Sequence, residues 1–189
     1  MSKFGIIVVA LIIGFTAVIV VKKSNEPKEP ILGIQHANQG EKHISQGQKH
    51  EAYNSDPASS GPHYADASAP AQWGVYTQEL PEEVFVHNEE HGGVVVTYNP
   101  KLLPADQLKK LQALFVPPYS KKGFSPTKAI VTPRTKDRHA IEIASWTWTL
   151  NMDKYDEVTL IKYYTQHAGE APEPGAGPNN TPINEAAGQ

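Results

Sequence analysis

The stretch "EVFVHNEEHGGVVVTY", residues 83–98, decides how the centre of this chain folds, because it sets two histidines and two glutamates between apolar runs. Valine and phenylalanine precede the polar cluster 87–91, and two glycines followed by "VVVTY" come after it. Residues of these β-branched and aromatic types are enriched in strands. We therefore expect short strands at 84–87 and 93–98, with the polar cluster at a strand end or turn rather than on a helix.

Further strands are expected on both sides of this stretch, at 73–77, 128–132 and 140–148. Leu108, Leu111 and the pair Leu114-Phe115 recur at helical spacing before two prolines, which predicts one helix that ends there. The sequence thus predicts a single small α+β domain with a mixed or mostly antiparallel sheet and two main helices.

The second helix is expected from about residue 154 to 167. Asp153 is the expected N-cap, and Val158, Ile161 and Tyr164 share one face at helical spacing.

The N-terminal stretch "FGIIVVALIIGFTAVIVV", residues 4–21, is uncharged, nearly all apolar and flanked by lysines. A run of about 18 such residues lies at the lower end of what spans a bilayer. A cleaved signal peptide is the alternative, but no good small-x-small cleavage site follows. We expect a transmembrane anchor at 1–23 with the domain outside the cytoplasm, the commoner arrangement for a single N-terminal anchor, although the lysines after the span oppose a simple positive-inside assignment.

Composition divides the rest of the chain into three parts. Residues 24–40 are polar and carry two prolines, which predicts a flexible stalk. Residues 41–168 are the expected globular domain, and the Gly-, Pro-, Ala- and Asn-rich segment 169–189 is expected to be a disordered tail. Within the domain, 41–72 has almost no regular pattern, but its tyrosines, histidines and "SSGPH" turn argue against simple disorder and for a functional loop.

The chain has no cysteine, which excludes disulfides, thiolate zinc sites, iron–sulfur clusters and cysteine nucleophiles. Its net charge of −3 gives no indication of a nucleic-acid-binding surface.

The histidine pair His87 and His91 can share one side of either a helix or a strand segment. Neutral imidazole is a common ligand for Zn, Cu, Ni and Fe, and a nearby carboxylate can ligate the ion or orient the ring. With Glu90, the pair also matches the H-x-x-E-H pattern of inverted zinc peptidases, which requires a helix that the expected strands do not provide. The alternative without metal is that Glu89 and Glu90 decorate a hairpin while the histidines bond to the backbone.

Two segments, "HEAYNSDPASSGPHY" (50–64) and "VHNEEHGGVVVTY" (86–98), carry a family resemblance together with the N-terminal apolar stretch. The chain resembles the DUF3105 family of uncharacterised, membrane-anchored bacterial and archaeal proteins. The matching elements are His43-Ile44 with Gly47, Tyr53 to Tyr64, Gly74-Val75-Tyr76, and Val86-His87 with Glu90-His91-Gly92. The stretches "TPR" at 132–134 and "IASWTW" at 143–148 fit more loosely.

The sequence departs from the family pattern at two positions: Ala58 replaces a usual proline, and Glu89 stands where the family tends to have an apolar residue. The family name records no established activity. The resemblance does imply that five side chains belong to one shared site: His43, His63, His87, Glu90 and His91.

Three functional hypotheses follow. The leading one is an extracytoplasmic metal-binding protein in which His63, His87 and His91 ligate Cu(II) or Zn, with Fe or Ni also compatible. His43 or His50 would complete the ligand set, and Glu90 would ligate the ion or hold an imidazole.

The second hypothesis is a metal-dependent hydrolase or oxidoreductase with Glu90 as general base. The third is a structural or partner-binding envelope module whose histidines and glutamates form a buried polar network. Met152 could add a thioether ligand that favours copper, although a lone methionine is more often part of a core. The sequence identifies no protein partner.

Overall fold

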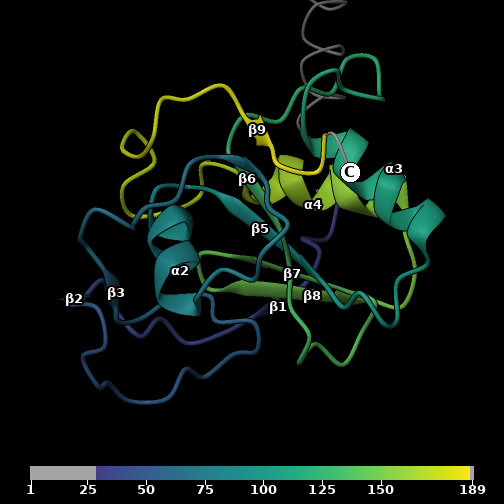
Figure 1. Cartoon of the computed structure of the whole chain (residues 1–189). Helices are drawn as coiled ribbons and strands as arrows, with labels where there is room; N and C mark the ends of the chain where they lie inside the picture. The colour runs from purple at the N-terminus through teal and green to yellow at the C-terminus, as the bar shows by residue number, and fades with distance from the viewer. Residues whose placement is uncertain (1–28, 188–189) are drawn as a thin grey trace, which may run out of the picture. The chain divides into compact units, whose positions relative to one another are not determined.

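The computed structural model describes residues 29–187 (Figure 1), so the anchor predicted for 1–23 lies outside the described residues. Within 29–187, no helix has the length and apolar character needed to cross a membrane. The chain divides into two units, Met1–Ile31 and Leu32–Gln189, and the features described below all belong to the second.

A seven-stranded mixed sheet forms the centre of this unit, in the order β1-β8-β7-β5-β6-β4-β9. Strands β5, β6, β4 and β9 pair in parallel, whereas β5, β7, β8 and β1 pair antiparallel. The strands are β1 (Ile34–Gln35), β4 (Gly74–Val75), β5 (Val94–Tyr98), β6 (Ala129–Pro133), β7 (Ile141–Ser145), β8 (Trp148–Met152) and β9 (Ile183–Asn184). The α+β class with a mixed sheet agrees with the prediction.

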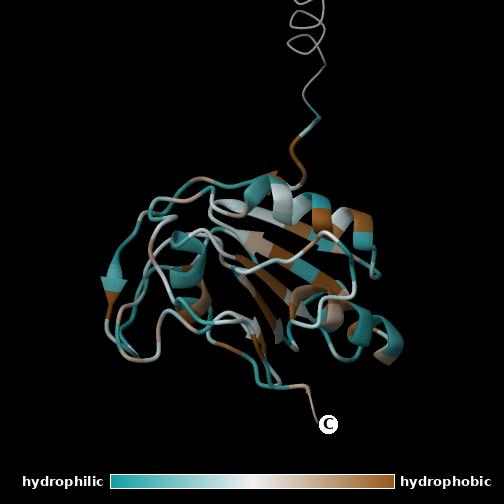
Figure 2. Ribbon diagram, turned by 90° about the horizontal axis from the view of Figure 1, so that it is seen from above, coloured by the Kyte–Doolittle hydropathy of each residue, from teal (hydrophilic) through white to brown (hydrophobic). Residues whose placement is uncertain are grey.

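The described residues contain three helices rather than the predicted two: α2 (Glu82–Glu90), α3 (Ala105–Phe115) and α4 (Glu157–His167). Successive side chains of β5 point to opposite faces of the sheet, so their packing partners show which helices cover each face. Val94 and Val96 pack in the cluster that contains the buried residues of α3 and α4, whereas Val95 packs with those of α2. Figure 1 shows α2 apart from α3 and α4, and Figure 2 shows apolar residues concentrated in the central strands. Both faces of the sheet are therefore covered.

Helix α2 contradicts the strand predicted at 84–87. Pro81 precedes the helix and two glutamates occupy its first turn, where negative charge is favourable. At the other end Gly92 has a φ of +79°, and the amides of Gly92 and Gly93 donate to the carbonyls of Glu89 and Asn88, both at 2.9 Å. This bonding pattern ends many helices. Residues 84–90 are all buried, so the helix has no polar face that would show its periodicity.

Other boundaries differ from the predictions in smaller ways. The strand expected at 140–148 is a hairpin, in which β7 and β8 pair around a turn with Thr147 at a φ of 64°. Helix α4 begins later than predicted, and the Asp156 carboxylate, not Asp153, accepts a hydrogen bond of 2.8 Å from the Thr159 amide. Val158 is exposed, because the buried face of α4 consists of Leu160, Tyr163 and His167.

Both flanking segments take part in the sheet. Residues 34–35, in the expected stalk, form β1 against β8. Residues 183–184, in the expected disordered tail, form β9 against β4. Gly74 of β4 makes this close pairing possible, because a Cβ there would lie 2.1 Å from the Ile183 carbonyl oxygen.

Candidate metal centre

The loop before α2 delivers two of the candidate histidines on adjacent short strands. Strand β2 (His43–Ile44) pairs in parallel with β3 (His63–Tyr64), in a register that places His43 opposite His63. The centroids of the two rings are 4.9 Å apart in an edge-to-face arrangement. His63 is fully buried, whereas the His43 side chain is 52% exposed and forms the solvent side of the pair.

Helix α2 brings His87 and Glu90 against these strands. The Glu90 Oε2 atom lies 3.1 Å from His63 Nε2, 3.5 Å from His43 Nε2 and 3.8 Å from His87 Nε2. Ligand atoms from these four residues all lie within 4.8 Å of one another, a spacing at which one metal ion could be held. The glutamate oxygen therefore lies among three imidazole nitrogens.

Backbone carbonyls fix the orientation of the two buried rings. His63 Nδ1 lies 2.8 Å from the Gly61 carbonyl oxygen, and His87 Nδ1 lies 2.5 Å from that of Tyr64. A carbonyl oxygen only accepts, so Nδ1 carries the proton in each ring and the Nε2 lone pair of the neutral ring faces Glu90. Lone pairs and a carboxylate oxygen that face one another repel unless a proton or a cation lies among them. Metal-binding histidines are commonly oriented by such carbonyl bonds.

The pKa shifts of His63 and His87 favour the neutral imidazole, which is the form that binds a metal ion. Burial lowers the pKa of His63 and of His87, while their bonds to the Gly61 and Tyr64 carbonyls oppose this. Burial raises the pKa of Glu90, and the neighbouring His43 and His87 imidazoles oppose the rise. The buried imidazoles are consequently neutral at pH 7, as a metal ligand must be.

His91 lies at the end of α2 and faces a different carboxylate. Its Nε2 atom is 3.5 Å from Glu173 Oε2, and its ring centroid is 4.6 Å from that of His87. Burial lowers the pKa of His91 to about 4, with a further contribution from His87. Glu90, His91 and Glu173 form a second group whose ligand atoms lie within 4.8 Å of one another. Glu173 cannot be identified from the sequence, because no motif distinguishes it within its low-complexity segment.

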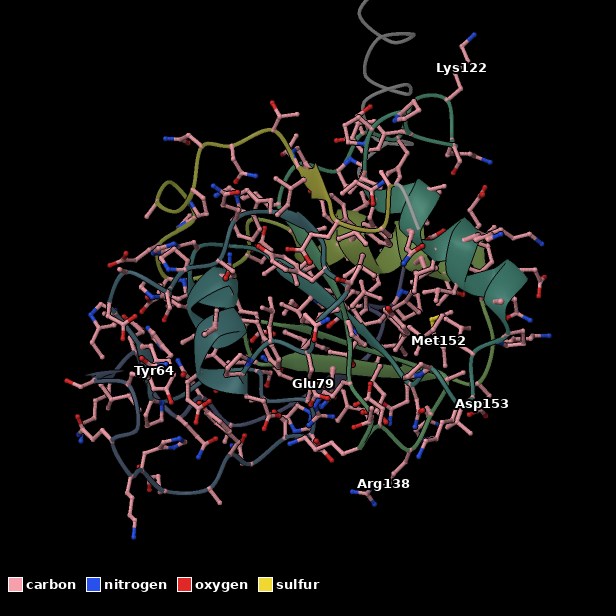
Figure 3. All side chains as sticks on the ribbon, in the orientation of Figure 1. Tyr64, Glu79, Lys122, Arg138, Met152 and Asp153 are labelled. Carbon is pink, nitrogen blue, oxygen red and sulfur yellow. The ribbon has the colours of Figure 1, made fainter. Side chains whose placement is uncertain are left out.

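Two other candidates lie outside both groups. His50 Nδ1 is 2.7 Å from the Glu51 carbonyl oxygen, and its Nε2 is 3.3 Å from Glu83 Oε1. Met152 packs in the core cluster that contains α3 and α4. Figure 3 shows it at the other end of the unit from Tyr64, which adjoins His63. Met152 therefore belongs to the core and does not reach the histidine group.

Arg134 connects the two elements that carry the site. Its guanidinium group, 1% exposed, donates to Asp56 in the loop before β3 and to Glu82 in the first turn of α2, as well as to Asp137. Burial alone would lower the pKa of Arg134, but the hydrogen bonds to Asp56 and Asp137 raise it. A permanently charged group thus ties the loop that carries His63 to the helix that carries His87. In the sequence, Arg134 belongs only to the loosely fitting stretch "TPR" at 132–134, which does not predict this role.

Residues 43–180 match the model of a family described as "Protein of unknown function (DUF3105)". The chain belongs to the DUF3105 family. This confirms the resemblance carried by the two histidine segments. The DUF3105 match begins at His43 and extends beyond Glu173, so it contains both groups of ligand atoms. Comparison of the chain with curated proteins and with solved structures finds no match.

Glu89 is a buried acid inside this DUF3105 domain. It is fully buried, and neither carboxyl oxygen has a hydrogen-bond partner within residues 29–187. Burial raises its pKa well above the ordinary value of 4.5, with a smaller contribution from Glu82.

Replacing Glu89 with leucine is expected to raise the free energy of unfolding by about 1–3 kcal/mol, the usual cost of a buried polar group without a partner. Because the pKa of Glu89 is raised by folding, its contribution is intact below the unfolded value of 4.5 and is lost as the pH rises toward the folded value. The gain should therefore be larger at pH 8 than at pH 5. Urea unfolding of the metal-free chain at both pH values measures it.

The matched control is Glu51→Leu, which changes an exposed glutamate and should alter the free energy of unfolding by less than about 0.5 kcal/mol. A Glu89→Leu chain that is less stable than the wild type at pH 8 would show that the acid contributes favourably to the core.

Proposed function

We propose that this protein binds a transition metal ion, Cu(II) or Zn(II), through His43, His63, His87 and Glu90. The observation that carries the proposal is the convergence of two oriented Nε2 lone pairs, those of His63 and His87, on Glu90 Oε2. A cation placed among these atoms would replace the hydrogen bond between His63 and Glu90 with coordination bonds. His43, on the exposed side, supplies the third nitrogen.

The set of ligand atoms favours borderline metals. Three imidazole nitrogens and one carboxylate oxygen, with no cysteine in the chain, suit Zn(II) and Cu(II) better than Cu(I), which prefers sulfur. Ca(II) and Mg(II) prefer sites made of oxygen atoms. Iron and nickel share the preference for imidazole and are the nearest competitors.

The position of Glu90 favours a ligand role over a general base. Its Oε2 atom lies 3.1–3.8 Å from three imidazole nitrogens, inside the group rather than beside it. The H-x-x-E-H pattern does lie at a helix, contrary to the strand prediction, but His91 faces Glu173 in this structure. Both features support binding of an ion over the peptidase chemistry that the pattern alone suggests.

We further propose that residues 4–21 anchor the protein in a membrane, with the DUF3105 domain outside the cytoplasm. The support comes from the sequence, in which this stretch is uncharged, nearly all apolar and flanked by lysines.

The test uses the full chain, purified in a non-ionic detergent without an affinity histidine tag and stripped of metal. Zn(II) or Cu(II) should bind with sub-micromolar affinity and raise the melting temperature. At a free-ion concentration of 100 times Kd, the added stability is about 2.7 kcal/mol. Isothermal titration and thermal denaturation measure the two effects.

Mg(II) serves as the control ion and should leave the melting temperature unchanged. If neither Zn(II), Cu(II), Fe(II) nor Ni(II) binds more tightly than micromolar, the proposal fails. The histidines and Glu90 would then form a polar network that shares a proton, as the structural hypothesis requires.

A further inference from the structure

We propose that a second divalent transition-metal ion binds beside the first, between Glu90, His91 and Glu173, so that the Glu90 carboxylate bridges two ions. The inference rests on the proposed function, because the bridge requires an ion in the histidine group. It adds a second metal position, and it assigns a role to His91 and Glu173.

The geometry of the second group carries the inference. One ligand atom each from Glu90, His91 and Glu173 lie within 4.8 Å of one another, and Glu90 is common to both groups. A carboxylate has two oxygens, and in two-metal sites the ions are about 3.5–4 Å apart. The adjacent His87 and His91 rings, with centroids 4.6 Å apart, place one imidazole in each group.

The contact between His91 and Glu173 is not an ordinary hydrogen bond. Their nearest atoms are 3.5 Å apart, whereas a charge-assisted hydrogen bond measures about 2.7–2.9 Å. The His91 side chain is 8% exposed, and its Nδ1 atom has no hydrogen-bond partner in the described part of the chain. The 3.5 Å separation of these two atoms is compatible with two ligands that share one ion.

Backbone hydrogen bonds hold the segment around Glu173 against the C-terminal end of α2. The Glu173 amide donates to the Glu90 carbonyl at 3.0 Å, and the Gly169 amide donates to that of Gly92 at 2.9 Å. The Lys128 ammonium group donates to the carbonyl oxygens of His91, Pro174 and Ala176, at 2.8, 2.6 and 3.3 Å. These bonds hold the backbone at Glu173 in place, while its side chain remains 56% exposed and accessible to an ion from solvent.

The two positions differ in their ligands. The first offers three nitrogens and one oxygen, whereas the second offers one nitrogen and two oxygens, which suits divalent ions such as Zn(II) and Cu(II) and disfavours Cu(I). The second ion should bind more weakly, because it has fewer imidazole ligands and lies beside an ion of the same charge.

The experiment measures how many Zn(II) ions bind to the full chain by equilibrium dialysis and mass spectrometry. The wild type should bind two ions, and Glu173→Gln, which preserves the size of the side chain, should bind one. Glu170→Gln changes an exposed glutamate in the same segment and should still bind two. Equal melting temperatures of the metal-free chains show that the fold is retained.

The outcomes separate the two proposals. One ion in the wild type overturns the second position and leaves the proposed function standing, whereas no ion overturns the proposed function itself. Two ions in both the wild type and Glu173→Gln place the second ion elsewhere and overturn the inference.

Electron paramagnetic resonance with Cu(II) gives an independent readout of the bridge. At one equivalent the spectrum should be that of an isolated Cu(II) ion. At two equivalents, magnetic coupling between ions about 3.5–4 Å apart should remove that signal. If the isolated signal simply doubles, the two ions do not share Glu90 and the inference fails.

Discussion

Replacing His63 and His87 together with alanine is expected to weaken Zn(II) binding by more than about 100-fold. Removing a hydrogen-bond partner that only orients a ligand already costs 10–100-fold in metal affinity, and this variant removes two ligands outright. These two rings are the ones whose Nε2 atoms the Gly61 and Tyr64 carbonyls orient toward Glu90. Competition with a chromophoric chelator measures the affinity.

The matched control is His50→Ala with His139→Ala, which removes the same number of histidines. His50 bonds to Glu83 and His139 to Asp153, so this variant should bind Zn(II) as the wild type does.

Because His63 is fully buried, its loss also leaves a cavity. Glu90→Gln removes a ligand with little change in volume and should also weaken binding strongly. Wild-type affinity in Glu90→Gln would contradict the assignment of Glu90 as a ligand.

Replacing Arg134 with methionine is expected to lower the free energy of unfolding by about 3–5 kcal/mol, the usual cost of removing one partner from a buried ion pair. The guanidinium group is the buried cation among four carboxylates, those of Asp56, Glu82, Asp137 and Glu142. Burial already raises the pKa of Asp137 to about 6, against hydrogen bonds from Thr97 and Arg134. Without Arg134, the remaining acids would repel one another. Urea unfolding at pH 7.5 measures the change.

Arg138→Met is the control for this prediction. The Arg138 side chain is 82% exposed and approaches Asp56 at 3.6 Å, so it should contribute less than about 1 kcal/mol. If Arg134→Met lowers stability no more than Arg138→Met, the network does not tie the loop before β3 to α2.

Much of the fold could be predicted from hydrophobic patterning. The helical spacing of Leu108, Leu111 and the pair Leu114-Phe115 predicts helix α3, and the structure buries Leu111, Leu114 and Phe115. The strands β4, β5 and β6 follow from short β-branched runs bounded by turn residues. Each of these elements has a distinct local pattern of apolar and polar residues, and the structure contains the element that the pattern predicts.

Helix α2 could not be predicted from that pattern, because residues 84–90 are buried on every side. A helix buried all round shows no polar stripe, and a short apolar run then resembles a strand. The signals that would have identified it lie at its ends, where Pro81 and two glutamates precede the helix and two glycines follow it. The valines after them instead predict a strand at 93–98 that begins at Gly93.

The candidate site was predictable where its residues carry a motif. The two histidine motifs predict His43, His63, His87 and Glu90 as members of one site, and the structure places their ligand atoms within 4.8 Å of one another. The position of Glu173 beside His91 could not be predicted. That placement depends on Lys128 and on backbone bonds to a Gly- and Pro-rich segment, which are tertiary contacts without a local sequence pattern.

The pairing of β2 with β3 bears on the kinetics of ion release. His43 is the exposed residue of the two-residue strand β2, whose parallel ladder with β3 holds it, whereas His63, His87 and Glu90 are buried. Short ladders of this kind open locally far more often than the whole domain unfolds. A bound ion could therefore leave through the opening of β2 alone. Its residence time would then depend on this two-residue ladder and be independent of the global unfolding rate.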